Sequence, residues 1–140
     1  DEPADRPSSW DMNGGLAVLG DVPKTMVYQL AHRLKDRYGW IPNRTLTRPP
    51  SAELRPDQTD QDSLPPYDVL DAILPAYVEK RLPASEIVSQ GWDETLVKWV
   101  IERVNRNEYK RWQAPPILRV TTKAFGIGRR LPIAQRFTDL

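Results

Sequence analysis

Apolar residues recur at helical spacing in four stretches of this chain. The first runs from Val22 to Tyr38, with Asp21 placed as its N-cap and Gly39 as its C-terminal stop. The same period predicts helices over residues 68–81, 85–90 and 94–112, with Gly91 closing the helix at 85–90 and Asp93 as the N-cap of the last one. Pro75 lies inside the second of these stretches, and an interior proline is expected to kink or split the helix. The pattern therefore predicts a chain built mainly of helices.

Two short segments favour extended backbone instead. Residues 16–20 follow a glycine turn, and residues 118–122 are rich in β-prone side chains. The last segment, 123–140, mixes arginines with glycines, so we expect an irregular basic tail. We expect one or two short strands, without the run of β-α units that a complete nucleotide-binding sheet needs.

The segment 48–66 is too polar and too rich in proline for a buried strand or a regular helix. Its prolines stand at 49, 50, 56, 65 and 66, and each one fixes φ and removes a backbone donor. Loops of this length inside compact domains are usually lids, binding loops or disordered segments. Composition alone leaves a lid and a disordered linker equally open.

Composition excludes several kinds of chemistry. The chain has 140 residues, a net charge of +1, no cysteine and one histidine. Thiolate metal sites, a cysteine nucleophile and a histidine-rich metal cluster therefore lack the necessary residues, and His32 is expected to be structural or at the surface. No apolar run reaches the roughly 20 residues that span a bilayer, so we expect a cytoplasmic protein. Residues 1–10 are polar and irregular, which favours a piece of a longer polypeptide.

Several ordered blocks of the sequence carry a family resemblance. They include Asp-Val-Pro-Lys-Thr at 21–25, Pro-Pro-Ser-Ala-Glu-Leu at 49–54, Pro-Asp-Gln-Thr-Asp-Gln-Asp-Ser-Leu-Pro-Pro-Tyr at 56–67, Asn-Glu-Tyr-Lys-Arg at 107–111 and Lys-Ala-Phe-Gly at 123–126. In this order and spacing they resemble the C-terminal half of the synthetase domain of glutamine-dependent NAD+ synthetases. The resemblance covers nearly everything from Asp11 to Arg136.

The resemblance implies an ATP pyrophosphatase whose complete domain has a Rossmann-like α/β fold, with residues 1–140 as its C-terminal part. Such enzymes use ATP and Mg2+ to adenylate deamido-NAD+, and ammonia from a glutaminase domain then displaces AMP to give NAD+. The family's phosphate-binding loop, Ser-Gly-Gly-x-Asp-Ser, does not occur in this sequence. We therefore expect that loop, most magnesium ligands and the glutaminase to lie on other segments, within a homo-oligomer.

The family's functional residues carry over to five positions. Lys24 and Ser51 match residues that contact ATP, and the amides at the start of the helix are expected to help Lys24 bind anions. Asp60 is the catalytic candidate, in a loop expected to cover the bound nucleotides and exclude water. Lys110 and Asp11 match contacts to deamido-NAD+, although the match fades upstream of Asp11. Weaker candidates are Gln58, Asp62, Glu108 and Arg111.

Two other interpretations stay open. The basic tail 123–140 could make the chain a non-enzymatic interaction module. The 20 basic and 19 acidic residues of the whole chain nearly balance, which argues against nucleic acid as the partner. The chain could also be part of another ATP pyrophosphatase, such as a GMP or asparagine synthetase. The blocks at 49–54 and 107–111 favour the NAD+ enzyme.

Overall fold

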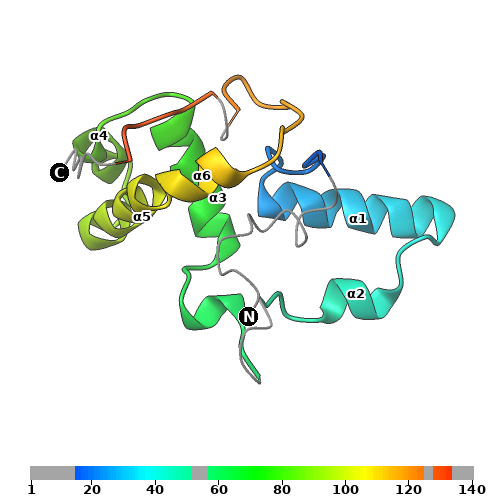
Figure 1. The fold of residues 1–140 in the computed structure, drawn as a ribbon. Helices are drawn as coiled ribbons and strands as arrows, with labels where there is room; N and C mark the ends of the chain where they lie inside the picture. Colours follow the sequence, from blue (N-terminus) through cyan, green and yellow to red (C-terminus); the bar gives the residue numbers. More distant parts are fainter. Residues whose placement is uncertain (1–14, 52–56, 125–127, 134–140) are drawn as a thin grey trace, which may run out of the picture. The chain divides into compact units, whose positions relative to one another are not determined.

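The structure is a computed structural model that describes residues 15–51, 57–124 and 128–133. Its described residues are mostly helical (Figure 1). In chain order the elements are α1 (Lys24–Tyr38), α2 (Asn43–Thr47), the 3-10 turn η1 (Asp60–Asp62), α3 (Tyr67–Val78), α4 (Ala84–Ser89), α5 (Glu94–Arg106) and α6 (Glu108–Gln113). The chain divides into two compact units, Pro23–Ala72 and Asp1–Val22 with Ile73–Leu140. We call the first the lid unit, because it contains the segment predicted to be a lid or a linker, and the second the core unit.

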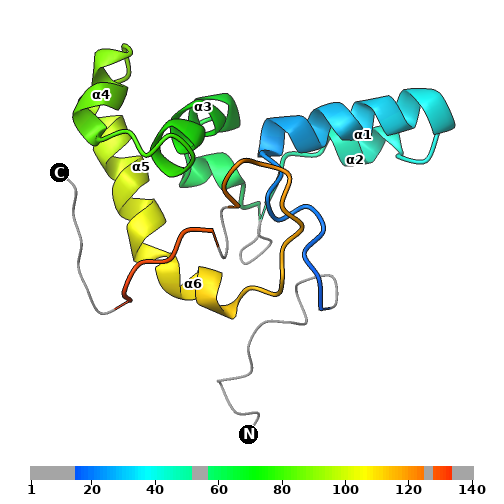
Figure 2. The ribbon, with the colours of Figure 1, turned by 90° about the horizontal axis from the view of Figure 1, so that it is seen from above.

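The hydrophobic core of the core unit is formed by the second half of α3 with α4 and α5. Its most completely buried side chains are Ile73, Ile87, Val97, Val100 and Ile101. Three of these lie on α5, where they recur at helical spacing and form one face of the helix. Figures 1 and 2 both show α4 lying beside α5. Each buried aliphatic side chain contributes about 1.5–3 kcal/mol, so this small cluster stabilises the unit.

The lid unit is built differently. Gly39 ends α1 in the left-handed region at φ +68°, and the chain returns through α2, which packs against α1. The Lys35 ammonium donates to the Asn43 side chain at 2.7 Å and joins the two helices. None of the described residues between 23 and 72 is fully buried. The described part of the lid unit therefore has no hydrophobic core of its own.

The helix predicted to begin at residue 22 begins at Lys24, and the prediction that Asp21 caps it is wrong. Pro23 is the N-cap, and it makes no side-chain capping bond. The buried carboxylate of Asp21 instead accepts hydrogen bonds from the backbone amides of Val120 and Thr121 and from the Thr121 hydroxyl, at 2.8–2.9 Å. The Asp21 carboxylate therefore binds the segment at residues 120–121, about a hundred positions later in the chain.

Two further helix predictions need correction. The helix predicted over 68–81 is α3, which ends at Val78. Of the two outcomes expected at Pro75, a split does not occur, because the proline lies near the end of α3 and the Glu79 amide donates to the Pro75 carbonyl. The single helix predicted over 94–112 is two helices, α5 and α6, which meet at Asn107. The Asn107 side-chain amide donates to the Arg103 carbonyl and so ends α5. The N-cap predicted at Asp93 is confirmed, since its carboxylate accepts from the Leu96 amide at 2.8 Å.

No strand forms among the residues described. One parallel bridge pairs Ala17 with Ile117, and the Ala17 amide donates to the Pro116 carbonyl at 2.9 Å. The segment expected at 16–20 therefore pairs at one residue only, and its partner Ile117 stands just before the segment expected at 118–122, which forms no strand. The described part of the tail, 123–124 and 128–133, has neither helix nor strand, as predicted.

Candidate functional site

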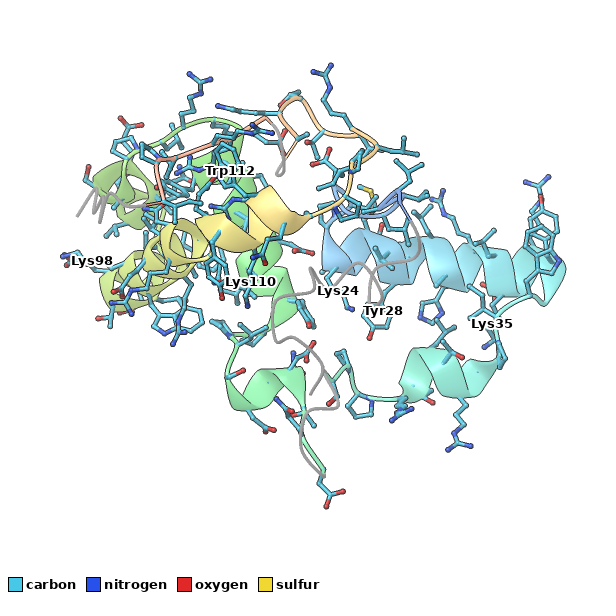
Figure 3. The ribbon with its side chains drawn as sticks, in the orientation of Figure 1. Lys24, Tyr28, Lys35, Lys98, Lys110 and Trp112 are labelled. Atoms are coloured by element: carbon cyan, nitrogen blue, oxygen red, sulfur yellow. The ribbon has the colours of Figure 1, made fainter. Side chains whose placement is uncertain are left out.

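Lys24 is the first residue of α1, and its ammonium group lies near two aromatic rings. It stands 5.9 Å from the Tyr28 ring centroid and 5.6 Å from that of Tyr67, the first residue of α3. Figure 3 shows Lys24 and Tyr28 on α1. Both rings attract the cation through their π faces and restrict where the side chain can lie. No described carboxylate lies within ion-pair distance of Lys24, so its charge is available to a bound anion.

The start of α1 is less open to anions than the sequence indicates. The Thr25 amide donates to the Asp71 carboxylate at 2.7 Å, so a group from α3 already occupies one of the free donors of the helix. A carboxylate at a helix N-terminus also offsets the positive end of the helix dipole. The attraction for a bound anion therefore comes from the Lys24 side chain more than from this helix terminus.

Tyr67 connects this region to the loop at 48–66. Its hydroxyl donates a short hydrogen bond to the carboxylate of Asp60. The Asp60 amide in turn donates to the Pro50 carbonyl at 2.9 Å, next to half-buried Ser51. Burial first, and then the hydrogen bond to Asp60, raise the pKa of the Tyr67 hydroxyl well above its usual range. Tyr67 therefore remains a neutral donor across the physiological pH range.

The described part of the loop after residue 56 contains a defined turn. Asp62 accepts from the Thr59 amide at 2.7 Å and from the Thr59 hydroxyl at 2.9 Å, and the two residues form a capping box around η1. The backbone bond from Thr59, more than its hydroxyl, lowers the pKa of the Asp62 carboxyl. The Gln58 side-chain oxygen is buried with no hydrogen-bond donor among the described residues. This part of the loop is organised by its own polar side chains.

Lys110 belongs to the core unit, whereas Lys24, Asp60 and Tyr67 belong to the lid unit. It is exposed on α6, with its ammonium 6.0 Å from the Tyr109 ring, and Figure 3 shows it on that helix. The helix is anchored beneath it by Glu108 and Arg111, which form an almost fully buried ion pair at 2.5 Å. Arg111 also donates to the Val104 carbonyl on α5 at 2.7 Å. Buried acid and base therefore fix the helix that carries Lys110.

Asp11 and His32 are the predicted positions that remain. Asp11 lies outside the described residues. No group of three or more His, Cys, Asp or Glu side chains that could hold a metal ion occurs within the described ranges. His32 is exposed on α1, as expected. The indole of Trp112 is half exposed, and the Arg130 guanidinium lies 4.4 Å from its ring, so this tryptophan is not a core residue.

Comparison with known proteins decides the family. The NAD synthase family model matches residues 9–114, which include Lys24, Ser51, Asp60, Tyr67 and Lys110. The chain belongs to the NAD synthase family.

Relatives of this NAD synthase family member are glutamine-dependent NAD+ synthetases, which agrees with the family match. The chain is 53% identical over 127 residues to a glutamine-dependent NAD+ synthetase from Synechocystis sp. and 54% identical over 125 residues to one from Acinetobacter baylyi. These matches cover 91% and 88% of this chain and 23% of each relative. The chain thus spans about a quarter of the length of the curated relatives that it matches.

A solved structure of the same kind of protein also matches. It is a glutamine-dependent NAD+ synthetase from Acinetobacter baumannii in complex with adenosine diphosphate. The match has a TM-score of 0.52 and 43% identity, and covers 91% of this chain and 22% of that one. No helix among the described residues is both long and apolar enough to cross a membrane.

Sequence reasoning missed two residues of the site in this NAD synthase family member. Tyr67 stands at the end of the block at 56–67, and Asp71 stands in the helix that follows. Their spacing gives no sign that one binds Asp60 and the other binds Thr25, because the first contact depends on how η1 folds back onto α3 and the second on how α3 packs against α1. An aromatic or acidic residue in the first turns of the helix that follows the segment 48–66 is the only available signal.

Proposed function

We propose that this chain supplies the lid and part of the nucleotide site of a glutamine-dependent NAD+ synthetase. In the proposed reaction, the nicotinate carboxylate of deamido-NAD+ attacks the α-phosphorus of ATP, and pyrophosphate leaves. Ammonia then attacks the acyl carbon, loses a proton, and AMP leaves with its phosphate oxygen, giving NAD+. The observation that carries the proposal is the linked set of Lys24, Tyr67, Asp60 and the loop at Ser51, inside a chain of the NAD synthase family.

Lys24 and Ser51 are the proposed contacts to ATP. As pyrophosphate leaves, negative charge accumulates on its oxygens, and a fixed cation stabilises that charge more in the transition state than in the ground state. The two tyrosine rings near Lys24 support this role because they restrict the ammonium without neutralising it. Ser51 adds a hydroxyl in the loop segment that the Asp60 amide binds through Pro50.

Asp60 is the proposed catalytic contact of the lid. Its carboxylate is held by Tyr67 and its amide by Pro50, so both its side chain and its backbone are fixed in the turn. A lid that closes with such a turn would exclude water, which otherwise hydrolyses an acyl-adenylate before ammonia arrives. Gln58, whose buried oxygen lacks a donor among the described residues, is a further polar group available for the closed state.

Lys110 and Asp11 are the proposed contacts to deamido-NAD+. For Lys110, the support is an exposed ammonium on a short helix anchored by the buried Glu108–Arg111 pair. A cation on a rigid support loses less conformational entropy when it binds a phosphate. Asp11 rests on the family resemblance alone.

Magnesium fits this chain only in part. The described residues hold no set of three acidic or histidine ligands, and the Asp60 carboxylate is already bound by Tyr67. We therefore place most ligands of the ion in the rest of the synthetase polypeptide. When bound there, Mg2+ would neutralise charge on the ATP phosphates.

The proposal also implies partners and a fold. The chain would complete a Rossmann-like α/β domain together with the N-terminal half of the synthetase, next to a glutaminase domain that supplies ammonia. A homo-oligomer, with deamido-NAD+ near the subunit boundary, belongs to the same proposal. ATP and deamido-NAD+ are metabolites of the cytoplasm, where we expect the enzyme to act. The interaction-module interpretation is not favoured by the comparisons.

A chimeric enzyme tests the proposed function. In it, the 127-residue segment of the Synechocystis relative is replaced by the matching part of this chain. We expect the chimera to convert deamido-NAD+, ATP and glutamine into NAD+ and AMP in equal amounts, measured by liquid chromatography. Substituting Asp60→Asn should lower the rate, whereas Asp36→Asn, on the exposed part of α1, should not. A folded chimera that binds neither nucleotide and forms no NAD+ would contradict the proposal.

A further inference from the structure

Helix α1 presents an apolar face to solvent. Met26, Leu30, Leu34 and Tyr38 recur every four positions, and their exposed fractions are 47%, 42%, 36% and 48%. Trp40 is 70% exposed and stacks on Tyr38, with ring centroids 4.4 Å apart. We call these five residues the α1 face. A helix with one apolar face normally buries that face against another element.

The lid unit offers no internal explanation for the α1 face. The described residues between 23 and 72 include none that is fully buried, and α2 is only five residues long. Contiguous apolar surfaces of this kind, with aromatic residues at one end, mark interaction sites in soluble proteins. Exposing them to water costs free energy that a partner would recover.

We propose that the α1 face is the docking surface for the part of the NAD synthase polypeptide that lies outside the region matched here. This inference rests on the proposed function, and it identifies the surface through which the two parts meet. The matched region is 23% of each of the two relatives named above, so about three quarters of such a polypeptide lies outside it. That remainder is large enough to cover a four-turn helix.

Charge argues against a second copy of the chain as the occupant. By helical periodicity Arg33 lies at one edge of the α1 face, Arg37 lies between its members, and Lys24 lies just beyond the other edge. The one carboxylate of the helix, Asp36, projects to the opposite side. Two copies packed face to face would bring these cations together, and like charges at an interface are unfavourable. The expected occupant is an apolar surface with neutral or acidic borders.

Oxidation of Met26 provides a direct test, because methionine reacts with peroxide according to its exposure. Met26 in the isolated 140-residue chain should react at nearly the rate of free methionine. In the Synechocystis chimera it should react at least about tenfold more slowly, as measured by peptide mass spectrometry. Acrylamide quenching of Trp40 fluorescence, with the other tryptophans changed to phenylalanine, should fall in parallel.

Matched substitutions in the chimera sharpen the test. Leu30→Glu places a carboxylate in the centre of the α1 face and should restore rapid oxidation of Met26. Gln29→Glu places the same group one position away, outside the face, and should leave Met26 protected. Equal oxidation of Met26 in the isolated chain and in a folded chimera would overturn the proposal. So would protection in the isolated chain that grows with its concentration, because that result would make a second copy the occupant.

The oxidation test is independent of activity. An inactive chimera with protected Met26 would support docking while contradicting the proposed reaction. An active chimera with exposed Met26 would support the reaction and contradict docking.

Discussion

Tyr67 donates its hydroxyl hydrogen to the carboxylate of Asp60, seven positions earlier in the chain. The bond joins the first residue of α3 to the first residue of the turn η1. Because the ring of the same tyrosine lies 5.6 Å from the Lys24 ammonium, one side chain contacts both the turn η1 and the cation proposed to bind ATP. The order of this turn and the position of Lys24 should therefore depend on each other.

Substituting Tyr67→Phe separates these two contacts. Phenylalanine keeps the ring near Lys24 but removes the donor to Asp60, so the turn should loosen while Lys24 stays in place. A part-buried hydrogen bond of this kind contributes about 1 kcal/mol, which predicts roughly fivefold faster hydrogen exchange at the Asp60 amide. Tyr28→Phe also keeps its ring near Lys24 and is the matched control. Unchanged exchange in Tyr67→Phe would show that the hydroxyl does not hold the turn.

Alkaline titration gives a second measurement on the same variant. The pKa of Tyr67 is raised above the ordinary value of 10.0 in the folded chain, so its stabilising effect is complete below about pH 10 and declines as the pH rises further. Absorbance at 295 nm should show a late tyrosine ionisation in the folded wild-type chain, and this component should be missing in Tyr67→Phe. Its persistence in the variant would assign it to another tyrosine.

The Asp62 carboxyl predicts a response to acid. Its pKa is lowered in the folded chain because the Thr59 amide and hydroxyl donate to the carboxylate. The contribution to the turn is therefore present above the unfolded value near 3.8 and is lost as the pH falls below it. The protection factor of the Thr59 amide, which is its intrinsic exchange rate divided by the measured rate at the same pH, should therefore fall as the solution is acidified through that range. In Asp62→Asn, exchange at Thr59 should be fast already at neutral pH, and an unchanged rate would contradict this role.

Asp21 predicts a loss of stability in the core unit. Its carboxylate accepts three hydrogen bonds from Val120 and Thr121, and Asp21→Asn replaces the charged acceptor by a neutral amide with one donor end. Hydrogen bonds to charged groups are worth about 1.5–3 kcal/mol, so the free energy of unfolding should fall by about that amount. Urea denaturation followed by tryptophan fluorescence measures it. Asp36→Asn, which changes an exposed aspartate, should shift it by less than about 0.5 kcal/mol.

The helices could be predicted from the sequence because local periodicity and caps determine them. Gly39, Gly91 and Asp93 act at the ends expected of them: Gly39 and Gly91 have positive φ, and Asp93 caps α5. The contacts of Asp21 and Tyr67 could not be predicted in this way. Asp21 is a reasonable N-cap by its position, but its actual partners lie about a hundred residues away. Only the folded chain brings them together.

In the candidate site, too, some features could be predicted from the sequence and others could not. Lys24, Ser51, Asp60 and Lys110 were predicted through the family resemblance, which identifies residue types at matching positions. The contacts that support these residues were not predicted. They involve Tyr67, Asp71 and the buried Glu108–Arg111 pair, whose partners are set by the folded structure. The pair at 108 and 111 looks like a surface ion pair in the sequence, because spacing of three residues on a helix carries no information about burial.

Lys24 gives the most direct test of nucleotide binding. Lys24→Met in the Synechocystis chimera keeps the length of the side chain but removes its charge, so contacts to phosphate oxygens should weaken. Charge-assisted hydrogen bonds contribute about 1.5–3 kcal/mol, and loss of one predicts an affinity for ADP at least about tenfold lower by calorimetry. Lys35 lies about three turns further along the same helix, where it binds Asn43 at 2.7 Å. Lys35→Met should therefore leave the affinity for ADP unchanged. A phosphate contact at Lys24 requires that only Lys24→Met loses affinity. Equal losses in both variants would contradict that contact and would indicate a general effect of charge.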